Sequence, residues 1–558
     1  MTWLLSLEKV SFAYGGGPKP ALDQVDFHIG PGEFVGLAGH LGAGKSTLIR
    51  AATGLAPKLL KGRFSGRVLV KGESIERRRV ADLAGTIGTV FQDFENQIFS
   101  TNVRRELAFG LENLGLDRRI MLERIARTAE LTGLSDLMDR EPQSLSGGQK
   151  QRLALASVLC LQPDLLLGDE PTTDLDPLGR RQVGQVLDRL VKSGHGVGLV
   201  DQDVDRLLDA DRLVVLESGR VAAQGPPAEV LADPSFCLDH GLFPPPLFDL
   251  FARLGLAERP RRAEAAKAVL DRHGFRLKPE QTLSLEPEPS GPVLIAADGV
   301  SFSYPDSPPA LTRLALEIKA GEFLALLGAN GSGKTTLVKL FNALLKPSSG
   351  RVLFQGRDTA GLSPAEMGRH VGFVFQNPDQ MLFAATVRDE VSFGLKNFGL
   401  PAGEIETRAA EALATVRLSG RESEDPFTLT RGERQKLAVA SVLAYRPEVL
   451  VLDEPTTGLD AAEQTAMMEL LVRLNRSGHT IIIITHAVDL ASAYARRLVL
   501  LESGRLAGDG PPARILARDD LLAQAGLVAP ENFRLGLMYG RPALTPAELA
   551  GSLTREPE

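Results

Sequence analysis

The pattern G-x-x-x-x-G-K-[ST] occurs twice in this chain, as GHLGAGKS beginning at Gly39 and as GANGSGKT beginning at Gly328. Glycines let such a loop turn so that successive backbone N–H groups point at phosphate oxygens, and the helix that follows favours anions at its N-terminus. The lysine can reach the β- and γ-phosphates, and the next hydroxyl is placed to bind Mg²⁺. These residues are Lys45 and Ser46 in the first pattern, and Lys334 and Thr335 in the second.

Two pairs of acids follow apolar stretches that have the length of buried strands. The pairs are Asp169–Glu170 after LLLG and Asp453–Glu454 after VLVL. A strand that ends in two carboxylates places them at the carboxyl edge of a parallel sheet, where a phosphate loop also lies. There the aspartate can hold the magnesium shell while the glutamate polarises an attacking water. Paired acids on a surface usually mean little, but their recurrence after a buried strand predicts catalysis.

The elements that position these residues are themselves repeated. VSFAY recurs as VSFSY, and VFQDFENQIF recurs as VFQNPDQMLF. From Gln92 and Gln376 onward the register is constant, because 376 − 92 and 454 − 170 both give 284. A conserved order and spacing of this kind indicates a tandem duplication. Strands alternate with helices in each copy, which predicts an α/β fold with a mainly parallel sheet.

The repeat divides the chain into four ranges. We expect a first domain over residues 1–255 with a short apolar tail, a linker over 256–291, a second domain over 292–515 and a C-terminal extension over 516–558. The linker contains ERPRRAEAAKAVLDRHGF, a possible short helix, and then EPEPSGP, which is typical of a flexible connection.

Composition limits the class of protein. The chain has 558 residues, too many for one compact core, and a net charge of −7, which does not favour a protein that coats nucleic acid. Cys160 and Cys237 are its only cysteines, which fits a reducing cytosol. The N-terminus lacks the pattern of a signal peptide, and no apolar run approaches the ~18 residues of a membrane span.

With these motifs in place, the chain resembles a pair of fused ATP-binding-cassette (ABC) ATPase domains over nearly all of both halves. The segment LSGGQ at Leu145–Gln149 is the signature of that family. The resemblance implies two tandem P-loop NTPase domains, each with a RecA-like core, an antiparallel β subdomain and a helical subdomain. It also implies that the two halves form an intramolecular dimer, in which the signature of one half closes over the nucleotide of the other.

The family pattern assigns roles to individual residues. Tyr14 and Tyr304 are expected to stack on adenine, Gln92 and Gln376 to sense the γ-phosphate, and Asp176 and Asp460 to communicate across the interface. In the first half, the residues expected to bind ATP are Tyr14, Gly39, Gly42, Gly44, Lys45, Ser46, Thr47, Gln92, Asp169 and Asp176, and Ser146, Gly147, Gly148 and Gln149 of the signature. In the second half, they are Tyr304, Gly328, Asn330, Gly331, Gly333, Lys334, Thr335, Thr336, Gln376, Asp453 and Asp460, and Thr430 and Gly432 of the signature. Mg²⁺ is expected at Ser46, Gln92, Asp169, Thr335, Gln376 and Asp453, and the catalytic residues are expected to be Glu170, Gln202, Glu454 and His486.

The two halves differ in two features of these sites, the residue after a buried strand and the signature. His486 follows a buried strand in the second half, whereas the first half has Gln202, which cannot carry a positive charge toward developing phosphate charge. The signature of the second half reads LTRGE at Leu429–Glu433. In the arrangement that the family implies, both departures fall in the composite site built on the first phosphate loop.

One strong hydrolytic site and one weakened site are therefore expected. The alternative is that Arg431 and Gln202 are tolerated variants and that both sites turn over, because Thr430 keeps a hydroxyl, Gly432 keeps a glycine and Glu170 keeps the expected base.

The segments FENQIFSTNVRRELAFGLEN and NPDQMLFAATVRDEVSFGLKNFGL resemble the ATPases of energy-coupling-factor (ECF) importers of vitamins and metal ions. That resemblance implies two membrane partners, a coupling (T-type) subunit and a small substrate-binding (S-type) protein, and a location on the cytoplasmic face of the membrane. Two alternatives stay open. One is a soluble double cassette that acts on ribosomes, although such proteins usually have two intact signatures and a long charged linker. The other is the fused ATPase of a sugar importer.

The same segments predict a groove for a helix of the membrane partner in each half. Its apolar residues are expected to be Phe94, Ile98, Phe99, Met381, Leu382 and Phe383, and Glu95 and Asp379 are expected to pair with a basic residue of the partner. Some of these apolar residues are expected to pack within the helical subdomain instead.

Overall fold

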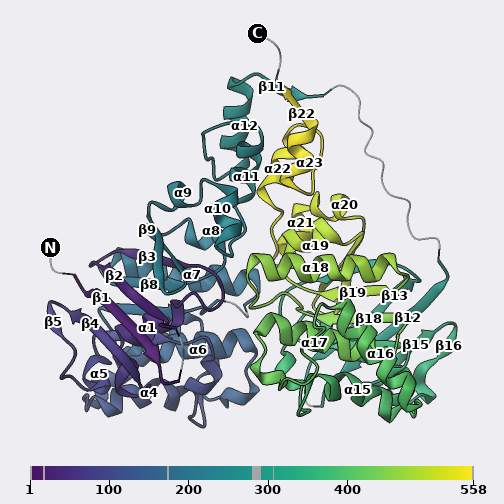
Figure 1. Ribbon diagram of the computed structural model, residues 1–558, viewed down its shortest axis with the longest axis horizontal. Helices are drawn as coiled ribbons and strands as arrows, with labels where there is room; N and C mark the ends of the chain where they lie inside the picture. The colour runs from purple at the N-terminus through teal and green to yellow at the C-terminus, as the bar shows by residue number, and fades with distance from the viewer. Residues whose placement is uncertain (1–2, 17–18, 173–174, 279–290, 306, 556–558) are drawn as a thin grey trace. The chain divides into compact units, whose positions relative to one another are not determined.

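The computed structural model describes residues 3–16, 19–172, 175–278, 291–305 and 307–555. The chain divides into two compact units, residues 1–259 and residues 260–558, each with its own sheets and its own core. In Figure 1 the first unit runs from purple to teal and the second from teal to yellow. Within the described residues, no helix combines the length and the hydropathy that crossing a membrane requires.

The core of the first unit is a six-stranded sheet with the order β10-β9-β3-β8-β7-β6. All neighbouring strands are parallel except β9 and β10. Every residue of β3, β7 and β8 is buried, because helices cover both faces of a parallel sheet and its central strands are continuous apolar runs. The strands are β3 (Phe34–Ala38), β6 (Ile87–Val90), β7 (Leu165–Asp169), β8 (Gly196–Val200), β9 (Arg212–Glu217) and β10 (Arg220–Gly225).

A second, antiparallel sheet of the first unit has the order β2-β1-β4-β5. Its strands are β1 (Leu5–Tyr14), β2 (Leu22–Ile29), β4 (Gly62–Val70) and β5 (Glu73–Ser74). In β2 the residues Leu22, Val25, Phe27 and Ile29 are buried and none of those between them is, as expected of a sheet with one face on the core.

Helices of the first unit fall into two groups. The group α4 to α6 forms the helical subdomain, in which α4 and α5 both pack on α6. Of the other helices, α1, α7 and α9 contact strands of the core sheet, α2 contacts β4, and α1 follows directly from the loop after β3. The bounds are α1 (Lys45–Ala52), α2 (Leu55–Lys58), α3 (Val80–Leu83), α4 (Val103–Asn113), α5 (Arg118–Thr132), α6 (Gly147–Cys160), α7 (Pro177–Lys192), α8 (Val204–Leu207), α9 (Pro227–Val230), α10 (Pro234–Asp239) and α11 (Pro246–Arg253).

The second unit repeats both sheets. Its core sheet has the order β17-β18-β19-β14-β20-β21, and its antiparallel sheet has the order β13-β12-β15-β16. The predicted α/β fold, with a core sheet, an antiparallel sheet and a helical group in each half, is confirmed. The strands are β12 (Val293–Ser303), β13 (Pro309–Lys319), β14 (Phe323–Leu327), β15 (Ser349–Phe354), β16 (Arg357–Asp358), β17 (Val371–Val374), β18 (Val449–Asp453), β19 (Thr480–Ile484), β20 (Arg497–Glu502) and β21 (Arg505–Gly510).

Helices of the second unit follow the same plan. The helices α15 and α16 pack on α17, and α13 follows from the loop after β14. The bounds are α13 (Lys334–Phe341), α14 (Pro364–Gly368), α15 (Val387–Asn397), α16 (Ala402–Thr415), α17 (Arg431–Leu443), α18 (Ala461–Arg476), α19 (Val488–Tyr494), α20 (Pro512–Leu516), α21 (Asp519–Gln524), α22 (Glu531–Met538) and α23 (Pro546–Ser552).

A tail module joins two segments that the sequence assigns to the linker and to the C-terminal extension. It consists of α12 (Ala263–Arg272), β11 (Phe275–Leu277), α22, α23 and β22 (Leu553–Arg555). The helix α12 packs on α22, β11 pairs antiparallel with β22, and Figure 1 shows α12 in teal beside α22 and α23 in yellow. Apolar residues on one face of α12 need such a partner, so part of the expected linker is an ordered element of the second unit. Residues 279–290 of that range lie outside the described residues.

Candidate active sites

Each phosphate-loop pattern lies between a buried strand and a helix, after β3 in the first unit and after β14 in the second. A Cβ atom on Gly39 would lie 2.2 Å from the carbonyl oxygen of Leu216, and the φ of Gly39 is +136°. Gly44, the residue before α1, has a φ of +109°. Gly328 and Gly333 are confined in the same way. Only glycine fits these positions without strain, so both loops depend on glycine for the turn that joins the strand to the helix.

The lysine of each pattern folds back over its own loop. The ammonium group of Lys45 donates to two carbonyl oxygens of the loop, at 2.6 and 2.8 Å. Lys334 makes the matching bonds at 2.8 and 2.9 Å. Both lysines are buried, so each holds a positive charge against the loop where an anion would be favoured.

A hydroxyl and a carboxylate meet at the start of the helix in each unit. Ser46 Oγ donates to Asp169 Oδ1 over 3.1 Å, and Thr335 Oγ1 donates to Asp453 Oδ2 over 3.0 Å. Burial raises the pKa of Asp169, and burial followed by the charge of Glu454 raises the pKa of Asp453 to about 6. Two hard oxygen ligands beside a phosphate loop fit Mg²⁺, whose charge would offset the cost of burying the carboxylate.

The glutamate after each strand has an unusual backbone. Glu170 and Glu454 have φ values of +52° and +47°, in the left-handed region that is uncommon for residues other than glycine. The Glu170 N–H donates to the carbonyl of Val200 and the Glu454 N–H to that of Ile484, at 3.0 and 2.8 Å. Both glutamates are at most 8 % exposed. Strain held at the same residue in both units, by bonds to the neighbouring strand, is typical of a functional position.

The neighbours of the two glutamates differ. Gln92 Nε2 donates to Glu170 Oε2 over 3.2 Å, and Gln202 Nε2 donates to Glu170 Oε1 over 3.3 Å. In the second unit, His486 Nδ1 lies 2.8 Å from Glu454 Oε1, and both side chains are 10 % exposed. Two neutral amides therefore donate to the first carboxylate, and an imidazole contacts the second.

Electrostatics favour the ionised form of Glu454. Burial acts to raise its pKa, but the charge and hydrogen bond of His486, with smaller contributions from Lys334 and Thr485, hold the pKa below its ordinary value. An ionised carboxylate that is buried and hydrogen-bonded can polarise a water molecule.

The expected adenine-stacking tyrosines lie beside the phosphate loops. The hydroxyl of Tyr14 is 3.1 Å from Thr47 Oγ1 and accepts a hydrogen bond from Arg50 over 3.0 Å. The hydroxyl of Tyr304 is 3.3 Å from Thr336 Oγ1. The structure therefore brings these tyrosines together with the first turn of α1 and of α13.

Both signatures begin a helix with a complete capping box. Ser146 Oγ accepts from the N–H of Gln149 over 3.3 Å, and the Gln149 side chain accepts from the N–H of Ser146 over 3.0 Å. Thr430 and Glu433 make the same exchange at 3.2 and 2.8 Å. The pattern [ST]-x-x-[EQ] is visible in the sequence, and it explains why the altered signature still starts a regular helix.

The larger change in the second signature is Arg431, which stands where the first has Gly147. The Arg431 guanidinium carbon lies 2.6 Å from the position that a Cβ on Gly458 would take, so the side chain covers the loop that leads to Asp460. Asp176 and Asp460 cap α7 and α18, where they accept backbone N–H groups at 2.8 and 3.0 Å.

The remaining predicted residues lie in loops or in the first turn of the signature helices α6 and α17. Gly42 and Gly331 have φ values of +80° and +81° with open space around them, and Asn330 belongs to the same loop as Gly331. Gln376 follows β17 and is exposed. A Cβ on Gly147 would meet open space, but two other signature glycines pack against their own units. A Cβ on Gly432 would lie 2.4 Å from a carboxylate oxygen of the Glu463 side chain. The same atom on Gly148 would lie 3.1 Å from the side chain of Leu175.

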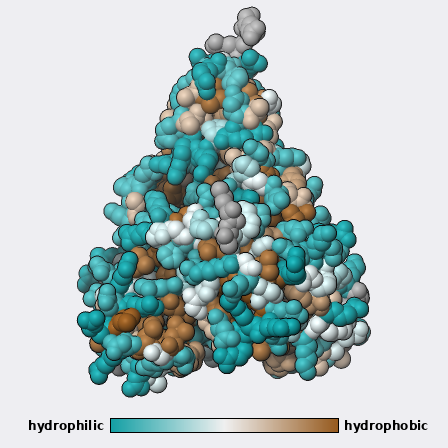
Figure 2. All heavy atoms as spheres, turned by 90° about the vertical axis from the view of Figure 1, so that its left-hand side faces the viewer, coloured by the Kyte–Doolittle hydropathy of each residue, from teal (hydrophilic) through white to brown (hydrophobic). Residues whose placement is uncertain are grey.

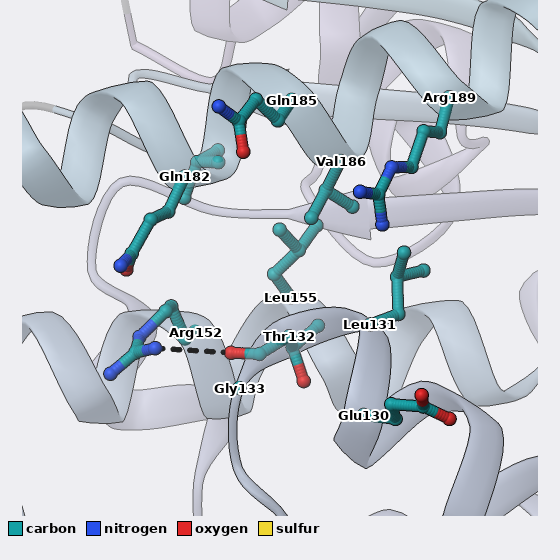
Figure 3. Close-up of a pocket in the computed structure, with 11 residues that line it drawn as sticks. Glu130, Leu131, Thr132, Gly133, Arg152, Leu155, Gln182, Gln185, Val186 and Arg189 are labelled. Carbon is teal, nitrogen blue, oxygen red and sulfur yellow. Dashed lines mark hydrogen bonds between the residues drawn. The ribbon is translucent and has the colours of Figure 1, made fainter.

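A separate cavity of about 250 Å³ lies between α5, α6 and α7 of the first unit (Figure 3). Arg152 on its wall donates to the carbonyl oxygen of Thr132 over 3.2 Å. Burial lowers the pKa of Arg152, and the charge of Asp176 opposes that change. The residues that line the cavity include none of those predicted to bind nucleotide; they mark where the helical subdomain meets the core.

The expected apolar groove is only partly exposed. Phe94 and Leu382 are buried at 6 % and 4 %, so the expectation that they receive a partner helix is wrong: they pack within the helical subdomain. Glu95 pairs with Lys150 and Asp379 with Arg434, both at 2.7 Å, within their own units.

What is exposed at this surface in each unit is a pair of aromatic rings. Phe99 and Phe383 are each 60 % exposed, and they meet Phe109 and Phe393 edge to face, with ring centroids 4.4 and 4.7 Å apart. Sequence reasoning missed Phe109 and Phe393, although both lie in the repeated FG dipeptide of the quoted segments.

Comparison with known proteins gives one consistent family. The profile described as "ABC transporter" matches residues 22–173 and 311–457. A provisionally named ABC transporter ATP-binding protein of Caldanaerobacter subterraneus subsp. tengcongensis is 42 % identical over 547 residues, which cover 96 % of each chain. A similarly named protein of Streptococcus pneumoniae serotype 4 is 35 % identical and covers 95 % of each chain.

A solved structure is also similar. The chain of cbiO1 from Clostridium perfringens, described as part of the ABC transporter complex cbiONQ, is 35 % identical, with a TM-score of 0.39. The match covers 44 % of the present chain and 98 % of that one.

The fold and the matched family agree with the predicted cofactors. When bound, Mg²⁺ supplies positive charge to the phosphates, and the side chains that fit it are Ser46 with Asp169 and Thr335 with Asp453. The two matched ranges together with the full-length relatives show that this chain belongs to the ABC transporter family, as an ATP-binding protein that hydrolyses ATP with Mg²⁺ to drive transport.

Proposed function

We propose that the chain is the energising subunit of an ECF-type importer of a vitamin, a vitamin precursor or a metal ion. Its partners are a T-type membrane coupling subunit and a small S-type substrate-binding membrane protein, and it works on the cytoplasmic face of the membrane. The observation that carries the proposal is the exposed aromatic pair, which recurs beside the glutamine segment in both units.

These pairs suit an apolar helix of a membrane partner. Exposed aromatic rings are costly in water and are typical of contact surfaces, where their rigid faces bury much area at little entropic cost. The view of the face that carries the first unit shows hydrophobic surface low on the molecule, at the height of α4 and α5 in Figure 1 (Figure 2). Glu95 and Asp379 each lie four residues before an exposed ring, Phe99 and Phe383. Their ion pairs with Lys150 and Arg434 offer charged groups for exchange with a partner.

Turnover in this proposal occurs at two unequal composite sites, each completed by the signature of the other half. The site with Glu454 and His486 receives the intact signature and hydrolyses ATP, while the site with Glu170 and Gln202 receives the altered one and turns over slowly. Support comes from the different groups that hold the two glutamates, neutral amides in one unit and an imidazole in the other.

The test is purification of the tagged chain from detergent-solubilised native membranes, with the double variant Phe99→Ser/Phe383→Ser beside the wild type. We expect the wild type to recover a transmembrane scaffold and a small substrate-binding membrane protein in stoichiometric amounts. The variant should lose both and keep its ATPase activity, because the two rings are exposed and lie outside the phosphate loops.

Leu59→Ser is the matched control, since Leu59 is also an exposed apolar residue, at 68 %. It should retain the partners. Recovery of the wild type with ribosomes, or without any membrane protein, would contradict the proposed importer and leave the ATPase assignment standing.

A further inference from the structure

A buried carboxylate without an assigned role lies beside the site of the first unit that contains Glu170 and Gln202, called here the first-half site. Asp201 follows β8 and is 4 % exposed. Its backbone N–H donates to the carbonyl oxygen of Leu37, over 3.2 Å, on the strand that leads to the phosphate loop. A buried carboxylate is costly unless its oxygens are hydrogen-bonded, so its bonds identify what it stabilises.

Both oxygens of Asp201 are engaged. Oδ1 accepts from the N–H groups of Gln202 and Asp203, at 2.8 and 2.9 Å, and Oδ2 accepts from Thr172 Oγ1 at 2.9 Å. The pKa of Asp201 is raised by burial and by the charge of Asp203, against the opposing effect of the bonds from Asp203 and Thr172 and the charge of Arg180. One side chain thus ties the loop that carries Gln202 to the loop that follows Glu170.

Both loops meet at Glu170. Gln202 Nε2 donates to Glu170 Oε1 over 3.3 Å, and Thr172 follows Glu170 by two residues. The backbone of Gln202 is therefore fixed by Asp201 while its side chain contacts the glutamate. An amide on a flexible loop would lose that orientation easily, since its bond to Glu170 is long.

The second unit uses a different residue at this position. In the constant register of 284, Thr485 corresponds to Asp201, and His486 to Gln202. The Thr485 hydroxyl accepts from the N–H of Ala487 over 3.1 Å and also bonds to Glu454, which lowers the pKa of that glutamate. A hydroxyl can approach the glutamate, whereas a carboxylate would repel it. The first half therefore combines Asp201 with Gln202, and the second half combines Thr485 with His486.

We propose that Asp201 is a positioning residue of the first-half site, which orients Gln202 toward Glu170 and couples that pair to the loop at Thr172. This role rests on the proposed turnover at that site. Asp201 acts through Gln202, so its loss should cost activity only while Gln202 is present.

The experiment is single-turnover hydrolysis of labelled ATP by full-length protein in excess, in a Glu454→Gln parent that reports the first-half site. Asp201→Ala should slow the reaction by roughly tenfold to hundredfold, the scale of a misoriented catalytic group. Asp201→Asn keeps an acceptor for the backbone N–H groups and should stay within about threefold of the parent. The double variant Asp201→Ala/Gln202→Ala should be no slower than Gln202→Ala alone.

Asp188→Ala, which removes a half-exposed carboxylate on α7, is the control and should match the parent. Multiplicative losses in the double variant, or Asp201→Asn as slow as Asp201→Ala, would overturn the positioning role while the first-half site stays active. A parent without any turnover would instead contradict the proposed hydrolysis at that site, and the positioning role with it. Thermal unfolding of each variant separates these results from loss of the fold.

Discussion

The two glutamates at the ends of β7 and β18 occupy the same strained backbone conformation but have different neighbours. Glu170 is held by two amides, and Glu454 by an imidazole and the hydroxyl of Thr457. An amide donates one hydrogen bond without charge, whereas a protonated imidazole also stabilises negative charge as it develops on a phosphate. The groups that donate to the glutamate are therefore one chemical difference between the halves.

Replacing Gln202 by histidine tests that interpretation. In a Glu454→Gln parent, Gln202→His should raise single-turnover hydrolysis by about tenfold or more, since one well-placed transition-state donor is worth on the order of 10²-fold. The control is Gln202→Asn, which keeps an amide on a shorter side chain and should not accelerate the reaction. A Gln202→His rate equal to that of the parent would show that the histidine is not what distinguishes the sites.

The hydroxyl–carboxylate contact at the start of α13 predicts a change in metal dependence. Thr335→Ala should raise the Mg²⁺ concentration needed for half-maximal phosphate release by about tenfold, and Thr335→Ser should restore it, because only the hydroxyl oxygen is needed. Ser46→Ala, at the slower site, should have a smaller effect on the total rate. A Mg²⁺ dependence that is unchanged in Thr335→Ala would contradict the role of this hydroxyl.

At the scale of elements, a feature could be predicted from the sequence when the residues that determine it lie close together along the chain. The phosphate loops and the acids after β7 and β18 follow from local patterns, because a glycine loop or a strand end needs few distant partners. The burial of the Phe94 ring could not be predicted, since it depends on how the helical subdomain packs. The same holds for the contact between Asp201 and Thr172, which are 29 residues apart.

The tail module shows this limit most clearly. The sequence suggested a short helix in the linker, but its partner α22 lies more than 250 residues later in the chain. The hydrogen bond from the N–H of Ala263 to Glu531 shows this (2.7 Å, a separation of 268 residues). Glu531 also accepts from Arg262 over 3.1 Å. The carboxylate thereby caps the first turn of α12, where a negative charge is favoured.

Removal of that cap should loosen the module. Glu531→Ala should destabilise α12 by about 1–2 kcal/mol, because a buried N–H loses a charged acceptor. Hydrogen exchange across α12, followed by mass spectrometry, should rise relative to the wild type. Glu264→Ala, which removes an exposed glutamate in the same turn, is the control. Equal protection of α12 in Glu531→Ala and in the wild type would show that the cap contributes little.

At the scale of the whole molecule, duplication has produced two units with the same sheets, the same phosphate loop and the same strained glutamate. Among the residues expected to act on ATP, the halves differ most in the second signature and in the pair of residues after β8 and β19. The altered signature keeps its capping box through Glu433, and its new Arg431 covers the loop at Gly458, so the second unit has changed the surface of this segment without losing the helix. Such a chain retains two ATP sites while allowing them to differ in rate.

The most direct test of unequal sites is steady-state phosphate release by Glu454→Gln and by Glu170→Gln at saturating Mg²⁺ and ATP. Each substitution replaces the expected base by a neutral group of the same shape, and loss of a general base costs about 10²- to 10⁴-fold at the site affected. We expect Glu454→Gln to remove most of the activity and Glu170→Gln to remove much less. Equal losses in the two variants would contradict the proposal that one half of this chain supplies the strong hydrolytic site.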